Sequence, residues 1–431
     1  IESLPDDFAG KDSLTKEYVH SYIVQLIAHE VGHTLGFRHN FKASTIYTLD
    51  QINDRAFTRE HGNIGTIMEY PSVNIAGPDQ VQGEFYGSTP GPYDDWIVEY
   101  AYTDLGDLST DEEREHLELI ASKAADPLLA YGTDYDGFGY SIKSPDPLCH
   151  LFDLGSDPLE FAEHQLGLTD ELWTNAIKKF ETPGARYQKI YTVFLRGWIA
   201  YSQAVRFATK TIGGIHRNKS RVGDPGAGLP FEPATAAEQQ RAMDFLISKI
   251  FAADAFDIPS DLLNKLQYEL MPNFTGSAYR VPTVDFPIHQ RVLGVHQLAL
   301  SRLYSPFVIG RLLNNTARVA DGDAIYSMHN MFTDLRRSIW SEMINPSNTN
   351  SYRRQLQLAH LNRIMGIYLS GAAVYPTDAR TLAANDLDIL EGVAKSAVNS
   401  SSVDEMTKAH FKEVKRQIAS AKDASRDYTK R

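Results

Sequence analysis

Residues 29–39 read HEVGHTLGFRH, and this short segment constrains the fold more than any other part of the chain. Apolar residues recur at helical spacing before and within it, which predicts a helix. Thr15 is the expected N-cap. Gly36 suits the left-handed residue that commonly ends a helix. On such a helix His29 and His33 are four residues apart and share one face.

Two imidazoles on one helix face can bind a single ion, with Zn–N distances near 2.0–2.1 Å. The chain turns back after the glycine, so His39 can supply a third nitrogen. Glu30 lies beside this face and could take a proton from a zinc-bound water. The spacing therefore predicts a Zn²⁺ site at His29, His33 and His39, with Glu30 as catalytic base. A buried helix with incidental histidines is the alternative, and it is the interpretation we favour for His20, His289 and His296, which lack such spacing.

The pattern HExxHxxGxxH resembles that of the metzincin clan of zinc endopeptidases. Residues 66–71, TIMEYP, resemble the methionine turn of that clan. The resemblance implies that Met68 lies under the zinc site as an apolar floor and does not ligate the ion. It also implies that Tyr70 steadies the oxyanion of the tetrahedral intermediate. Ordinary core packing is the alternative for both residues.

Three segments are similar to large bacterial zinc metalloproteases that have a long helical C-terminal region. They are IAHEVGHTLGFRHNF (27–41), FDLGSDPLEFA (152–162) and TIGGIHRN (211–218). Metzincins normally have a sheet before the zinc helix, whose edge strand aligns the substrate. Because 28 residues precede His29, we expect an upstream N-terminal part of the same protein, or another chain, to supply it. By family resemblance the expected location is extracytoplasmic: periplasmic, cell-surface or secreted.

The remaining chain favours a mainly α fold, in which a C-terminal metzincin subdomain (zinc helix, Met-turn and following helix) joins a larger helical domain. We expect residues 1–115 to hold the zinc site, 116–168 to be a loop-rich connection, and 169–431 to be α-helical. Residues 104–160 are rich in Asp, Gly and Pro and show few helical repeats. The aspartates of residues 134–158 fit turns better than a calcium site, because no EF-hand spacing is present.

Composition excludes several kinds of partner. The formal net charge is −13 and no Lys/Arg run is present, which argues against nucleic acid. No apolar run is long enough to span a membrane. Cys149 is the only cysteine, so neither an intrachain disulfide nor a cysteine-rich zinc site can form.

The prediction is therefore a zinc metalloendopeptidase that acts on protein or peptide substrates. The alternative is a helical module that binds a protein or polymer, with a structural or vestigial zinc site. Glu30 favours catalysis, because a structural site needs no general base.

Overall fold

The protein is mainly helical, as the sequence predicts. The computed structural model describes residues 11–78, 80–138, 143–268, 285–320, 322–370 and 374–428. Within these ranges the strands form one two-stranded sheet, β1 (Ile215–Arg217) with β2 (Phe231–Pro233).

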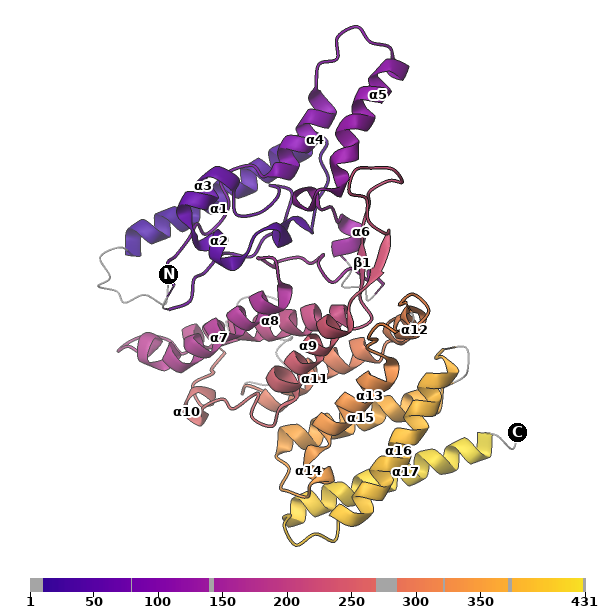
Figure 1. The fold of residues 1–431 in the computed structure, drawn as a ribbon. Coiled ribbons are helices and arrows are strands. Elements are labelled where there is room, and N and C mark those ends of the chain that lie inside the picture. The colour runs from indigo at the N-terminus through magenta and orange to yellow at the C-terminus, as the bar shows by residue number, and fades with distance from the viewer. Residues whose placement is uncertain are drawn as a thin grey trace. The chain divides into compact units, whose positions relative to one another are not determined.

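The chain divides into two compact units (Figure 1). Unit 1 comprises Ile1–Lys179 and Ile215–Glu232, and unit 2 comprises Phe180–Gly214 and Pro233–Arg431. The division at residues 115 and 168 stays a prediction, because compactness alone does not define domains. Among the described residues, no helix is both long and apolar enough to cross a bilayer.

Unit 1 contains the helix that carries His29 and His33, the segment 66–71 and a set of short helices. In chain order its helices are α1 (Lys11–Thr34), η1 (Ala43–Ile46), α2 (Leu49–Asn53), α3 (Arg55–His61), α4 (Pro92–Tyr102), α5 (Thr110–Ala121), η2 (Ser122–Ala125), η3 (Pro127–Leu129), α6 (Asp134–Gly137) and α7 (Pro158–Phe180). Helices α4 and α5 pack side by side (Figure 1).

One helix start and one loop differ from the expectation. Helix α1 begins at Lys11, so Thr15 lies inside it and is not its cap. The carboxylate of Asp54 accepts hydrogen bonds from the first turn of α3, which separates α3 from α2. The prediction that residues 104–160 are loop-rich was wrong for Thr110–Ala121, which form helix α5. There the side chains of Ser109 and Glu112 form a capping box, and acidic residues fill the first turn, where they suit the helix dipole.

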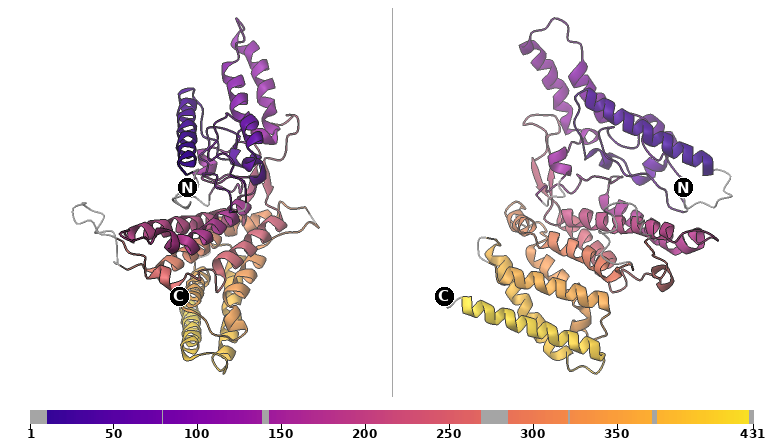
Figure 2. Two further views of the ribbon diagram at one scale, coloured as in Figure 1. Left: turned by 90° about the vertical axis from the view of Figure 1, so that its left-hand side faces the viewer. Right: turned by 180° about the vertical axis from the view of Figure 1, so that it is seen from behind.

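Unit 2 is a helical assembly with a buried aromatic core. Its helices are α8 (Gln188–Thr211), α9 (Ala236–Leu246), η4 (Ile247–Phe251), α10 (Ser260–Leu263), α11 (Ile288–Leu303), α12 (Pro306–Asn315), α13 (Met328–Ile339), α14 (Ser341–Ile344), α15 (Ser351–Tyr368), α16 (Thr377–Ala397) and α17 (Glu405–Tyr428). Helix α16 packs against both α15 and α17 (Figure 2).

Several buried polar side chains of unit 2 are paired with one another. His360 is fully buried, accepts a hydrogen bond from the Trp340 indole at 3.0 Å and bonds the Tyr304 hydroxyl at 2.8 Å. Arg353, also buried, forms a bidentate pair with Glu342. Pairing of this kind removes the cost that an unsatisfied buried polar group would impose.

Candidate metal centre

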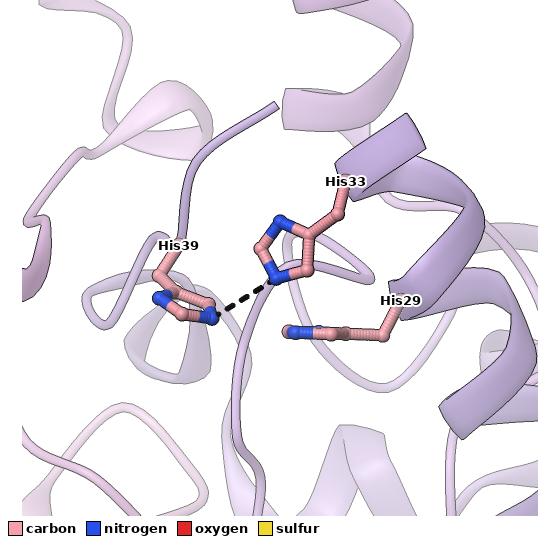
Figure 3. Close-up of side chains that lie close together, drawn as sticks. All are labelled: His29, His33 and His39. Carbon is pink, nitrogen blue, oxygen red and sulfur yellow. Dashed lines mark hydrogen bonds between the residues drawn. The ribbon is translucent and has the colours of Figure 1, made fainter. Parts of the chain in front are cut away.

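Helix α1 and the turn after it bring three histidines together (Figure 3). His29 and His33 project from the last two turns of the helix. Gly36 has φ +86, a left-handed conformation that glycine adopts without a side-chain penalty. This lets the Phe37 amide return to the Gly32 carbonyl at 3.0 Å, and the chain reverses.

The three imidazoles face a common space. One nitrogen of each ring lies within 4.8 Å of the others, and the Nε2 atoms of His33 and His39 are 3.2 Å apart. Two nitrogens bound to one tetrahedral zinc at 2.0–2.1 Å are separated by about 3.4 Å. The spacing therefore suits ligands of a single ion.

The second nitrogen of each ring is already engaged, which fixes the tautomer. The Nδ1 partners are the Ile67 carbonyl for His29 (2.8 Å), the Phe37 carbonyl for His33 (3.0 Å) and the Asp134 carboxylate for His39 (2.6 Å). Each partner is an acceptor, so each Nδ1 carries the hydrogen and each Nε2 presents a lone pair to the common space.

His29 gives independent support for a metal. Its side chain is buried, and its Nε2 has no hydrogen-bond partner. Burial lowers the pKa of His29, partly offset by the bond to the Ile67 carbonyl, so the ring stays neutral. A buried, neutral nitrogen without a partner is costly unless a ligand satisfies it.

Met68 lies against the helix that carries His29 and His33, and its expected role as the floor of the site stays a prediction. It is fully buried and packs against α1 at Gly32. A Cβ at Gly32 would lie 2.2 Å from the Met68 Sδ, so only glycine permits this close approach. The Met68 carbonyl also accepts the Asn40 amide at 3.2 Å, which joins the turn to the segment that carries His39.

The comparisons with known proteins agree with this arrangement. A family model described as Met-zincin matches residues 11–347, which is most of the chain and includes the three histidines and Met68. The chain belongs to the Met-zincin family. Neither the curated proteins nor the solved structures contain a match. Family membership indicates a zinc metallopeptidase-like protein.

In this Met-zincin, Tyr70 borders the same space as the histidines. Its ring centroid lies 5.0 Å from that of His29 and 4.8 Å from that of His39. Burial raises the pKa of Tyr70, and the carboxylates of Glu30 and Asp134 raise it further. The hydroxyl therefore stays protonated at neutral pH and can donate a hydrogen bond.

Glu30 is exposed at the position that follows His29 on α1. Its charge raises the pKa of both His29 and Tyr70, so its carboxylate lies in the neighbourhood of these two side chains. A carboxylate there is placed to exchange a proton with a group held at the cluster. The catalytic roles of Glu30 and Tyr70 stay predictions.

The start of α4 holds the Met-turn in place. The Asp94 carboxylate accepts the amide hydrogens of Ile67 at 2.9 Å and Gly91 at 2.8 Å, and bonds the Thr66 hydroxyl. Burial raises the pKa of Asp94, while the Thr66 hydrogen bond opposes this. Asp94 thus joins the start of α4 to the segment 66–71.

Two polar contributors escaped the sequence reasoning. Asn40 is fully buried and bonds the Ala130 carbonyl and the Gly132 amide, both at 2.9 Å. Asp134 bonds His39 across 95 residues. The only signal for Asp134 was its place in the aspartate-rich segment 134–158.

The other histidines lie apart from the cluster. His20 is exposed on α1. His289 is exposed and bonds the Ser351 hydroxyl at 2.8 Å, while His296 is buried and bonds the Ile250 carbonyl at 3.0 Å. Surface and packing positions are what the sequence indicated for them.

Proposed function

We propose that this Met-zincin is a zinc-dependent metalloendopeptidase that hydrolyses peptide bonds in proteins or peptides. The observation that carries the proposal is the set of three Nε2 lone pairs facing one space, with every Nδ1 engaged elsewhere. His29, His33 and His39 would hold the ion. Bound zinc supplies Lewis-acid polarisation of the substrate carbonyl and makes water acidic enough to react near neutral pH.

The chain's own residues would move the protons. The Glu30 carboxylate takes a proton from the attacking water and later passes it to the leaving amine nitrogen. The Tyr70 hydroxyl, kept protonated by its raised pKa, donates a hydrogen bond to the oxyanion.

A binding module with a structural zinc site is the second candidate. Structural zinc usually has four protein ligands, whereas catalytic zinc has three and an open position. Across the described part of the chain, the potential metal-binding group consists of the three histidines alone. This supports the peptidase over the module.

The direct experiment is Glu30→Gln in the intact protein. We expect zinc content to be unchanged and the cleavage rate of casein or a peptide library to fall about 10²–10⁴-fold. Glu115→Gln, which removes an exposed carboxylate in α5, is the matched control and should keep full activity. Hydroxamate or phenanthroline should abolish the wild-type cleavage. Full activity in Glu30→Gln would refute the role of the base, and a zinc-loaded wild type that cuts nothing would favour the binding module.

We also propose that an upstream N-terminal part of the protein covers one face of α1 and aligns the substrate. Large apolar side chains on this helix, together with Leu35 directly after it, are 41–58% exposed. They are Val19, Tyr22, Ile23, Leu26, Ile27, Val31 and Leu35. A contiguous apolar stripe of this size is typical of a protein interface.

Amide exchange tests this second proposal. The upstream part should slow exchange along α1, and Ile23→Asp with Ile27→Asp should weaken its binding. Unchanged exchange would contradict it. The resemblance to large bacterial metalloproteases supports an extracytoplasmic location, which cell fractionation tests.

A further inference from the structure

We propose that Asp134 is a positioning residue that fixes the His39 imidazole as the third zinc ligand and thereby sets the affinity for zinc. The proposal rests on the proposed function only in requiring that the histidines hold zinc. It does not require that the protein cleaves peptides.

The contact is short and oriented. The Asp134 Oδ1 accepts the His39 Nδ1 hydrogen at 2.6 Å, slightly shorter than the roughly 2.7–2.9 Å of charge-assisted N–H···O hydrogen bonds. The other oxygen, Oδ2, accepts from the Arg38 guanidinium at 3.2 Å and from the Thr133 hydroxyl at 3.3 Å. The contacts of Oδ2 thus hold the carboxylate in place, and Oδ1 orients the imidazole.

His39 needs this support more than the other two ligands do. His29 and His33 are carried by α1, and backbone carbonyls hold their Nδ1 atoms. His39 lies on the irregular segment after Gly36. A side-chain carboxylate from α6 takes the place of the carbonyl there, and it adds a negative charge that makes the imidazole a stronger donor to a cation.

Helix α6 is built to hold Asp134 in this place. Two residues on, the buried Asp136 forms ion pairs with Arg217 and with Lys219, the latter at 2.7 Å. A Cβ at Gly137 would lie 2.5 Å from the Phe41 ring, so α6 packs directly on the residue two positions after His39. These contacts explain why the aspartate-rich segment serves His39, although it showed no metal-binding spacing in the sequence.

A purely structural role is the competing explanation, because the Asp134–His39 bond also ties α6 to the chain after α1. The two roles predict different effects of an Asp134 substitution on zinc affinity. A positioning residue changes the zinc dissociation constant only through His39, whereas a structural one lowers zinc affinity whether or not His39 is present.

The experiment measures the zinc dissociation constant of the full chain by competition with a chromophoric chelator. We expect Asp134→Ala to weaken zinc binding about 10–100-fold, as loss of such partners usually does. Asp134→Asn keeps the shape and loses the charge, so it should fall between Asp134→Ala and the wild type. Asp111→Ala, which removes an exposed carboxylate in α5, is the matched control and should change the constant by less than about threefold.

The decisive comparison uses a His39→Ala background, in which Asp134→Asn should have no further effect on zinc affinity. Equal zinc affinity in Asp134→Ala and the wild type would overturn the proposal, as would an equal loss with and without His39. If the variants behave as expected but no substrate is cut, only the proposed function fails. If the wild type binds no zinc, both proposals fail.

Discussion

Gly32→Ala tests whether Met68 supports the metal centre from below. The added Cβ would lie 2.2 Å from the Met68 Sδ, whereas nonbonded atoms of this kind rest at about 3.5–4.0 Å. The sulfur must therefore move by more than about 1 Å. Because Met68 is fully buried, the move displaces its neighbours as well.

Two opposing contributions set the size of the effect. Overpacking of a buried site usually costs about 1–3 kcal/mol. Alanine gains up to about 1 kcal/mol over glycine in a helix interior. We therefore expect unit 1 to lose up to about 2 kcal/mol in its free energy of unfolding, and we expect zinc to bind more weakly because the floor of the site has moved.

Thermal unfolding of the metal-free and zinc-loaded protein provides the assay, with about 2–4 °C per kcal/mol for a unit of this size. Gly167→Ala is the matched control: it lies in α7, and its Cβ would meet nothing within 4 Å. That variant should be slightly stabilised, so the difference between the two isolates the contact with the sulfur. In a Met68→Ala background, Gly32→Ala should become neutral or stabilising. If Gly32→Ala raises stability as much as Gly167→Ala does, the reasoning is wrong.

Two further predictions concern unit 2. Burial lowers the pKa of His296 and His410 to about 4 and that of His360 to about 3. Below pH 6.5 these three histidines bind protons in the unfolded chain but stay neutral in the folded unit. The free energy of unfolding, measured by urea titration, should therefore stay constant above pH 6.5 and fall towards pH 4. The expected fall is on the order of 1 kcal/mol per pH unit for each histidine, and a free energy that does not change with pH would contradict this. Arg353→Ala leaves the Glu342 carboxylate without its guanidinium partner. Urea titration at neutral pH should then show a loss of about 3–5 kcal/mol in the free energy of unfolding. A loss below about 1 kcal/mol would show that the pair does not stabilise unit 2.

Local rules in the sequence were enough to find the metal-binding histidine cluster. Helical periodicity places His29 and His33 on one face, and the left-handed preference of glycine explains the reversal at Gly36. These features depend on residues within one or two turns of each other. The convergence of His39 on the other two follows from that reversal.

Contacts between distant segments could not be predicted in this way. Asp134 is 95 residues from His39, and nothing in its own neighbourhood distinguishes it from a turn aspartate. The close approach of Gly32 to Met68 likewise depends on how the turn packs on α1. The missed helix α5 is a different case. Its capping box was readable, but the Gly- and Pro-rich segments around it dominated the interpretation.

X-ray absorption at the zinc edge of the purified protein tests the central claim most directly. The account predicts one zinc per chain, bound by three imidazole nitrogens at about 2.0–2.1 Å and by one oxygen from water. His33→Ala should weaken zinc binding, so that the zinc content after dialysis falls well below one per chain. A protein without zinc, or a zinc ion with four protein ligands, would contradict the account.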